Sequence, residues 1–190
     1  MKKHFYAMMS RMKNIYRWGL MRNTRNENLS EHSLEVAFIA HALAVINNVR
    51  LGGNVSPEKT AVSGMYHDTT EIITGDMPTP IKYYNCTIKK AYKDIEKVAE
   101  QRLLDNLPDD FKAEFTKIYN PDANIARLVK AADKISALIK CIEESNMGNR
   151  EFAVAEISTR KAISELDCPE ANIFIEEFLD SFSLSLDELN

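Results

Sequence analysis

The chain has 190 residues, a formal net charge of −4 and an isoelectric point of about 5.6, with 45% apolar and 27% charged residues. This length can bury a sizeable core, and the acidic balance argues against a nucleic-acid polymer as partner, because duplex binding needs a basic surface. Only 6 glycines and 6 prolines are present, which favours long helices over a turn-rich β architecture. We therefore predict one all-α domain that spans residues 1–190.

The cysteines and the apolar stretches indicate the cellular compartment. Cys86, Cys141 and Cys168 are odd in number and widely spaced, which argues against a disulfide framework and indicates a reducing environment. The first residues carry no apolar run long enough for a signal peptide. The longest apolar stretch, 36–46, is interrupted by His41 and is too short to span a bilayer. We predict a cytoplasmic protein with no membrane partner.

The first predicted helix covers residues 4–20, where apolar and basic side chains recur at helical spacing. Arg17 and Trp18 close it, and Gly19 is a typical stop signal. By ordinary habit Arg17 is a cation at a helix end, and Trp18, the only tryptophan of the chain, is a core residue. Taken alone, this segment favours those structural interpretations over a functional one.

The second predicted helix begins at Ser30, a favourable N-cap, and is apolar nearly all round from Leu34 to Ile46. Such a pattern is typical of a buried, central helix. His32 lies in the first turn, where a cavity beside a core helix would open. We interpret His41, further along the same helix, as a structural histidine.

The third predicted helix starts at Ser56 and Pro57 and continues through residues 67–71. The segment 74–80 then breaks the helix with one glycine and two prolines. A rigid loop of this kind on a helical scaffold suits substrate contacts, although it also serves as a plain helix-to-helix turn. Further helices are predicted at 81–104, from 108 onward, and at 125–142, 151–166 and 170–181.

The stretch 67–71 carries the strongest chemical signal of the sequence. His67 and Asp68 are adjacent, and Glu71 follows one helical turn later, so a continuous helix would bring the three to one face. An imidazole beside a carboxylate can hold a divalent metal, and a free carboxylate one turn away can accept the proton of an activated water. A lone His-Asp pair is more often a solvated surface pair or a cap.

Two further residues would complete a metal shell, His32 and Asp133. Asp133 flanks the apolar stripe of 125–142, next to two alanines, so it can reach a cavity between helices; the alternative is a solvated carboxylate paired with Lys130 or Lys134. Two histidines and two aspartates form a nitrogen and oxygen donor set that suits Zn, Mn, Co, Fe(II) or Ni. The lack of a thiolate argues against structural zinc.

This pattern resembles the HD-domain superfamily of metal-dependent phosphohydrolases, and most closely the bacterial YfbR-like 5′-deoxynucleotidase family. The matching stretches are Arg17-Trp18 and residues 21–23, 27–34, 67–71, 74–82 and 181–188. The resemblance runs over nearly the whole chain. It implies an HD-domain helical bundle, a homodimer, a divalent transition metal such as Co or Mn, and a deoxyribonucleoside 5′-monophosphate as substrate.

The resemblance also implies roles for single residues. The implied metal ligands are His32, His67, Asp68 and Asp133, and the implied catalytic residues are Glu71, as the proton-transfer group, and Asp68. The implied substrate contacts are Arg17 and Lys82 to phosphate with Thr79 nearby, Trp18 beside the sugar, Asp76 to the 3′-hydroxyl, and His32, Pro80 and Ile81. Met77 and Ile81 stand where the family has Leu and Val, and both changes stay apolar.

Selection against ribonucleotides would follow from a bulky apolar wall such as Trp18, which leaves a 2′-hydroxyl clashing or desolvated. Two other classes of function stay open. A different HD-type enzyme, such as a phosphodiesterase acting on another nucleotide, would share the metal shell without needing the Arg17-Trp18 pair. A non-catalytic helical binding module would carry the His/Asp cluster incidentally.

Overall fold

The computed structural model of the protein describes residues 3–82 and 84–190, apart from the side chain of Thr79, and these ranges contain helices and no strand. The all-α prediction is confirmed. The longer helices are α2 (Leu29–Arg50), α3 (Pro57–Tyr66), α6 (Cys86–Asp105), α7 (Asp109–Tyr119), α8 (Ala123–Asn146), α9 (Ala153–Ser164) and α10 (Pro169–Phe178). The short ones are α1 (Phe5–Met9), α4 (Glu71–Thr74), α5 (Thr79–Lys82) and the 3-10 helices η1 (Ser10–Asn14), η2 (Arg150–Phe152), η3 (Leu179–Ser183) and η4 (Leu186–Leu189).

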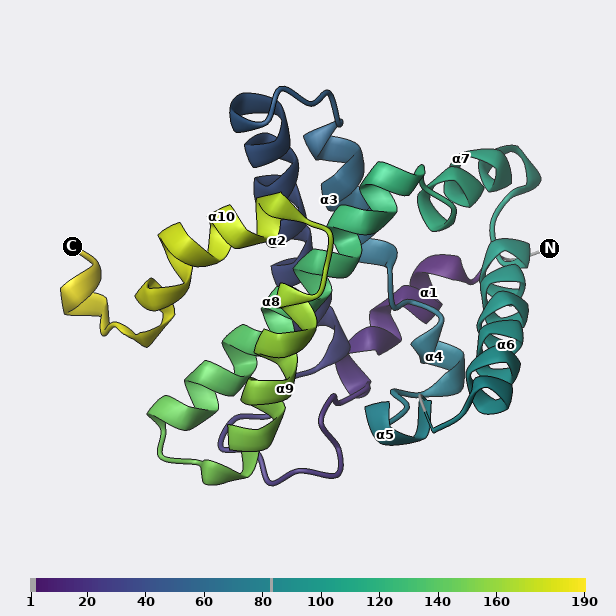
Figure 1. The fold of residues 1–190 in the computed structure, drawn as a ribbon. Coiled ribbons are helices and arrows are strands. Elements are labelled where there is room, and N and C mark those ends of the chain that lie inside the picture. The colour runs from purple at the N-terminus through teal and green to yellow at the C-terminus, as the bar shows by residue number, and fades with distance from the viewer. Residues whose placement is uncertain (1–2, 83) are drawn as a thin grey trace.

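The core forms where α2 and α8 meet, with α3, α9 and α10 packed around them (Figure 1). Its fully buried side chains include Leu43 of α2 and Leu128, Ile135 and Leu138 of α8. A second, smaller cluster joins Phe5 of α1 to the C-terminal end of α6. Each buried leucine or isoleucine stabilises the fold by roughly 1.5–3 kcal/mol, so the two central helices form a rigid base for the residues at their ends.

The N-cap of helix α2 lies two residues earlier than the predicted Ser30. Asn28 is its N-cap, and the Asn28 side chain and Glu31 satisfy each other's backbone N–H groups in a capping box. One face of α2 is also less buried than the sequence suggests, because Leu34, Phe38 and Val49 are exposed. His41 lies on that exposed face, so its interpretation as a structural histidine is wrong.

Helix α2 is long and apolar enough to cross a membrane, with a mean hydropathy of 1.3 in its most apolar window. The helix is longer than the apolar stretch 36–46 on which the sequence expectation was based. Of that window 56% is buried inside the protein, against α3, α8 and α10. Core helices of globular proteins meet the same criterion, so this property says little about a membrane.

The N-terminal segment does not form the predicted helix over 4–20. Helix α1 ends at Met9, η1 ends at Asn14, and the chain then runs alongside the start of α2. The backbone N–H of Arg17 donates to the carbonyl of Glu27 at 3.0 Å, and that of Leu29 donates to Ile15 at 2.9 Å. This pairing removes Arg17 from any helix end and brings it over the N-terminus of α2.

The predicted helix through 67–71 is also interrupted. Helix α3 ends at Tyr66, and Glu71 begins the separate helix α4. Similarly, the predicted helix 81–104 is split into α5 and α6, since the Asn85 side chain caps the N-terminus of α6 through the backbone N–H of Ile88. The breaks leave residues 67–82 as a succession of turns and short helices beside the core.

Gly64 allows α3 to lie close against α2. A Cβ atom at this position would meet the Ala37 Cα at 3.0 Å and the Val36 carbonyl oxygen at 3.3 Å, which are rigid backbone atoms. We expect Gly64→Ala to lower the free energy of unfolding by about 1–3 kcal/mol, measured by urea denaturation, because the two helices must separate. Gly19→Ala is the control, since a Cβ there meets nothing within 4 Å. Equal stability of the two variants would contradict close packing.

Candidate metal centre

Four side chains from three separate segments meet above the N-terminus of α2. His32 is in the first turn of α2, His67 and Asp68 follow α3, and Asp133 is on α8. One ligand atom from each lies within 4.8 Å of the others. These are the four residues that the sequence analysis proposed as metal ligands, and the fold brings all of them together.

The orientation of His67 is fixed by the backbone of α3. Its Nδ1 lies 2.8 Å from the Gly64 carbonyl oxygen, which can only accept a hydrogen bond. Nδ1 therefore carries a proton, and Nε2 is the ring nitrogen that can offer a lone pair to a metal once its own proton has left. That Nε2 atom lies 3.0 Å from Oδ2 of Asp68 and 3.9 Å from Oδ1 of Asp133, at the centre of the cluster.

His32 is fully buried and is held from behind by two oxygen atoms. Its Nδ1 lies 3.1 Å from Oγ of Ser136 and 3.4 Å from Oε1 of Glu27. Ser136 donates its own proton to Glu35, so it accepts from the imidazole. Nε2 is thereby the ring nitrogen of His32 that faces the cluster, 3.2 Å from Asp133 and 3.6 Å from Asp68.

The donor set fits a divalent cation. The Nε2 atoms of His32 and His67 are buried, and neither makes a hydrogen bond of normal geometry within the described ranges. Buried polar atoms are normally satisfied, so two lone pairs that converge beside two carboxylates point to a missing electron-pair acceptor. Two imidazoles and two carboxylates are donors that transition metals accept.

The charges of the cluster are strongly coupled. Burial would raise the pKa of Asp133, but the adjacent His32 and His67 hold it well below its usual range. Burial would lower the pKa of His67, but the carboxylates of Asp68 and Asp133 raise it to about 9. The centre is therefore a place of negative potential that favours a bound cation.

Arg17 lies directly against the cluster. Its guanidinium is 12% exposed and lies 3.3 Å from Oδ2 of Asp68 and 3.9 Å from Oδ1 of Asp133. Burial would lower the pKa of Arg17, but these carboxylates and that of Glu27 raise it. A buried, permanently charged fork beside a metal centre is suited to bind the oxygens of a phosphate group.

Glu71 is buried at the start of α4, with its Oε2 atom lacking a hydrogen-bond partner among the described residues. Burial, together with the negative charges of Asp68 and Asp76, raises the pKa of Glu71 to about 8. A carboxyl group with a pKa near neutrality is suited to accept and return a proton.

The remaining predicted substrate residues differ in burial and in their contacts. Trp18 is half-buried, and its backbone N–H partly offsets the rise that burial causes in the pKa of Asp76. Lys82 lies 3.0 Å from Glu96 and 4.7 Å from the centre of the Tyr92 ring. Pro80 and Ile81 are exposed on α5. The Thr79 side chain lies outside the described part of the chain, so its predicted contact stays a prediction.

Sequence reasoning missed three residues that orient the cluster: Gly64, Ser136 and Glu27. Ser136 follows Asp133 by one helical turn, and this spacing is the signal that could have found it. Gly64 precedes His67 by three residues in the same way. Glu27 gives no comparable periodic signal, because it lies in an irregular segment just before the N-cap of α2.

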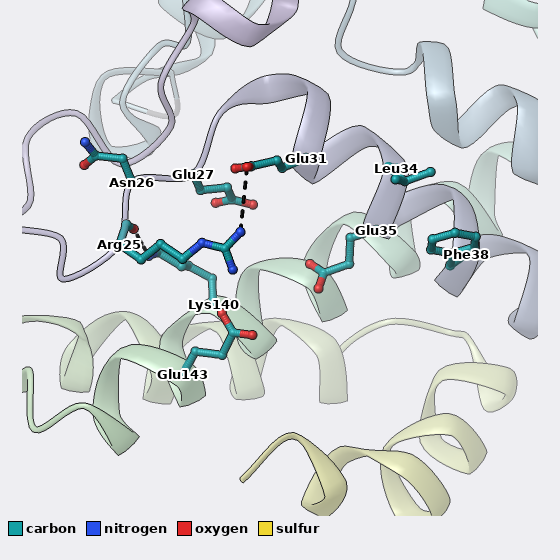
Figure 2. A pocket seen from close by; sticks show the side chains of 9 residues that line it. All are labelled: Arg25, Asn26, Glu27, Glu31, Leu34, Glu35, Phe38, Lys140 and Glu143. Carbon is teal, nitrogen blue, oxygen red and sulfur yellow. Dashed lines mark hydrogen bonds and ion pairs between the residues drawn. The ribbon is translucent and has the colours of Figure 1, made fainter. Parts of the chain in front are cut away.

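A cavity of about 330 Å³ opens beside Glu27 and Glu35 (Figure 2). Its lining residues are Arg25, Asn26, Glu27, Glu31, Leu34, Glu35, Phe38, Lys140 and Glu143. None of the predicted substrate residues is among them. The cavity therefore reaches Glu27, whose carboxylate lies 3.4 Å from Nδ1 of His32, and none of the four candidate ligands lines it.

Comparison with known proteins identifies the family. Residues 4–182 match the 5′-deoxynucleotidase YfbR-like family. The chain is 48% identical to a 5′-deoxynucleotidase of Photobacterium profundum, covering 100% of this chain and 99% of that protein. It is also 48% identical to a 5′-deoxynucleotidase of Vibrio cholerae, with the same coverage.

Solved structures show the same fold. An HD-domain phosphohydrolase of Listeria innocua superposes with a TM-score of 0.82 at 20% identity, covering 94% of this chain and 88% of that one. An HD phosphohydrolase of cyanophage S-2L, solved with dA and one catalytic Zn²⁺, has a TM-score of 0.64 at 18% identity and covers 93% and 95%. The family match and the full-length sequence identity place this chain in the 5′-deoxynucleotidase YfbR-like family, and its fold is that of the HD-domain phosphohydrolases.

Proposed function

We infer that the protein is a metal-dependent phosphomonoesterase that hydrolyses deoxyribonucleoside 5′-monophosphates to deoxynucleoside and phosphate. The observation that carries this function is the convergence of four N and O donors with the buried Arg17 beside them, in a chain about half identical to 5′-deoxynucleotidases over its whole length. A binding module would have no reason to bury these groups without partners.

The metal would be held by His32, His67, Asp68 and Asp133. A divalent ion bound there lowers the pKa of water and neutralises charge on a phosphoryl oxygen. We propose Co²⁺ or Mn²⁺, because mixed imidazole and carboxylate donors suit these ions. The cyanophage protein holds Zn²⁺, which makes zinc a third candidate.

The chain's own residues divide the remaining work. Arg17 binds the phosphate oxygens, assisted by Lys82, and keeps the phosphorus atom against the metal ligands. Glu71 takes a proton from the attacking water and returns it to the leaving 5′-oxygen. Asp76 accepts a hydrogen bond from the 3′-hydroxyl of the substrate.

Trp18 is the proposed wall against a 2′-hydroxyl. Its φ of 59° lies in the left-handed region, which costs a non-glycine residue roughly 1–2 kcal/mol. The strain is held by neighbours, since the indole packs on Phe152 with ring centres 5.3 Å apart. Strain that is maintained in this way is commonly found at ligand sites.

The function is tested by measuring phosphate release from matched deoxy- and ribonucleoside monophosphates, with cyclic and dinucleotide esters as further substrates. Each is assayed after chelation and after addition of Co²⁺, Mn²⁺ or Zn²⁺. We expect release only with metal, and fastest from deoxynucleotides. Preference for a diester would support the phosphodiesterase alternative, and failure on every ester with every ion would support the binding module.

Trp18→Ala is expected to relax selection against ribonucleotides more than it slows deoxynucleotide turnover. A buried, unpaired hydroxyl costs roughly 1–3 kcal/mol, so the ratio of kcat/KM values should fall by about one to two powers of ten. Tyr16→Ala, which removes an aromatic ring that is 56% exposed on the same segment, is the control. A ratio unchanged from wild type, with both substrates slowed alike, would show that Trp18 is only scaffolding.

We also propose a cytoplasmic homodimer whose contact surface includes the C-terminal segment. Phe178 and Leu186 are 43% and 78% exposed on this segment, which supports an apolar contact. Sedimentation equilibrium measures the mass directly, and Leu186→Asp should weaken self-association if the segment takes part. A monomeric wild-type chain at micromolar concentration would contradict the proposal.

A further inference from the structure

Glu27 is positioned between the metal ligands and the substrate residues, although it belongs to neither group. Its side chain is 13% exposed. Its backbone lies in the segment 27–29, which is hydrogen-bonded to residues 15–17. Asn28, the next residue, is the N-cap of α2. The backbone at Glu27 is thus fixed on both sides, by the cap and by the hydrogen bond from Arg17.

The two carboxylate oxygens of Glu27 have different partners. Oε2 accepts from the indole N–H of Trp18 at 2.9 Å and lies 3.6 Å from Nε of Arg17. Oε1 lies 3.4 Å from Nδ1 of His32. One carboxylate therefore contacts Trp18, which is proposed to face the sugar, Arg17, which is proposed to bind the phosphate, and the candidate metal ligand His32.

We propose that Glu27 is a positioning residue that holds His32 in its metal-binding tautomer and, through the same carboxylate, holds Trp18 and Arg17 in place for the substrate. This proposal rests on the function inferred above. It adds a residue that acts only through its neighbours, and it predicts that metal affinity and the setting of Trp18 depend on one side chain.

The groups around residue 27 require a carboxylate at this position. The Trp18 indole can only donate, so it requires an oxygen at one edge of residue 27, and the positive charge of Arg17, 3.6 Å away, favours a carboxylate there. His32 Nδ1 carries a proton, because Ser136 already donates to Glu35, and it requires an oxygen at the other edge. A carboxylate meets both demands. A glutamine of the same shape has only one oxygen, so it can accept from either Trp18 or His32. At the remaining contact its NH₂ group faces an N–H group.

Glu27→Gln therefore isolates the hydrogen-bonding role from size. If the amide oxygen stays on Trp18, the NH₂ group faces His32 and favours moving its proton to Nε2, which removes the lone pair needed for the metal. If the amide turns over, Trp18 loses its acceptor. Partners that orient a metal-binding histidine typically contribute 10–100-fold in metal affinity.

The experiment measures two quantities that do not depend on turnover, the Zn²⁺ dissociation constant by chelator competition and the fluorescence of Trp18. Trp18 is the only tryptophan of the chain, so the emission reports this site alone. The control is Glu143→Gln, which removes the same charge from an exposed residue lining the same cavity. Circular dichroism confirms that both variants are folded.

We expect Glu27→Gln to bind Zn²⁺ about 10–100-fold more weakly, with a changed emission maximum and greater quenching by acrylamide, while Glu143→Gln matches the wild type. A Glu27→Gln protein that equals the wild type in either quantity overturns the proposal. A wild-type chain that bound no Zn²⁺, Co²⁺ or Mn²⁺ would contradict the proposed function instead, and the fluorescence comparison alone would then decide the role of Glu27.

Discussion

Asp68→Asn is expected to abolish metal binding and, with it, phosphate release. The Oδ2 atom of Asp68 lies 3.0 Å from His67 Nε2, 3.6 Å from His32 Nε2 and 3.3 Å from the Arg17 guanidinium, so one atom contacts two candidate metal ligands and the proposed phosphate-binding arginine. Loss of an outer partner already costs up to about 100-fold in affinity, and loss of a direct ligand should exceed that. Chelator competition measures the affinity.

The asparagine substitution keeps the size of the side chain and removes only the charge and one acceptor oxygen. Asp94→Asn, a surface change on α6, is the matched control and should bind metal as the wild type does. Wild-type metal affinity in Asp68→Asn would show that Asp68 is not a ligand. Loss of helical circular dichroism would identify unfolding as the cause.

Glu71→Gln is expected to retain the metal and lose turnover. Glu71 is 5% exposed and its Oε2 atom has no hydrogen-bond partner within the described part of the chain, so the carboxylate is available for proton transfer. Positioned general acid–base groups typically contribute 10²–10⁴-fold, and kcat should fall by about that factor. Single-turnover kinetics measures the loss, and chelator competition tests whether metal affinity stays within about twofold of wild type.

The two variants separate two roles that activity alone would confuse. Asp68→Asn should lose both metal and turnover, whereas Glu71→Gln should lose only turnover. If Glu71→Gln also released the metal, Glu71 would be a ligand and the division of labour proposed above would be wrong.

The four candidate ligands could be found from sequence because each carries its own local signal. His32 opens an apolar helix, Asp133 flanks an apolar stripe, and His67 and Asp68 are adjacent. Periodicity assigns such residues to one end or one edge of a helix, and the core then brings those positions together. The all-α class followed from the same periodic patterns.

The local geometry around Glu71 could not be found in this way. Periodicity predicts a continuous helix, but the Thr69 hydroxyl donates to the Tyr66 carbonyl at 2.9 Å and lies at hydrogen-bond distance, 3.0 Å, from the Tyr119 hydroxyl. Threonine side chains compete with helical hydrogen bonds when a partner is available. The partner here is 50 residues away in the chain, so no local pattern reveals it.

The positions of Arg17 and Trp18 could not be predicted from local sequence patterns for a related reason. Their segment follows the hydrogen bonds to residues 27–29, and the left-handed backbone of Trp18 depends on contacts with Phe152 and Glu27. Each partner lies outside the window in which helical spacing is read. The family resemblance named these residues without explaining how the chain holds them.

The assembly of the ligands from three distant segments also links metal supply to the lifetime of the protein. An unfolded chain cannot hold His32, His67 and Asp133 together, so an ion binds only the native state. Ligand at a thousandfold excess over its Kd then adds about 4 kcal/mol to the free energy of unfolding. Proteases that act on transiently opened chains would meet the metal-loaded form roughly a thousandfold less often, and a metal-starved cell would clear this protein first.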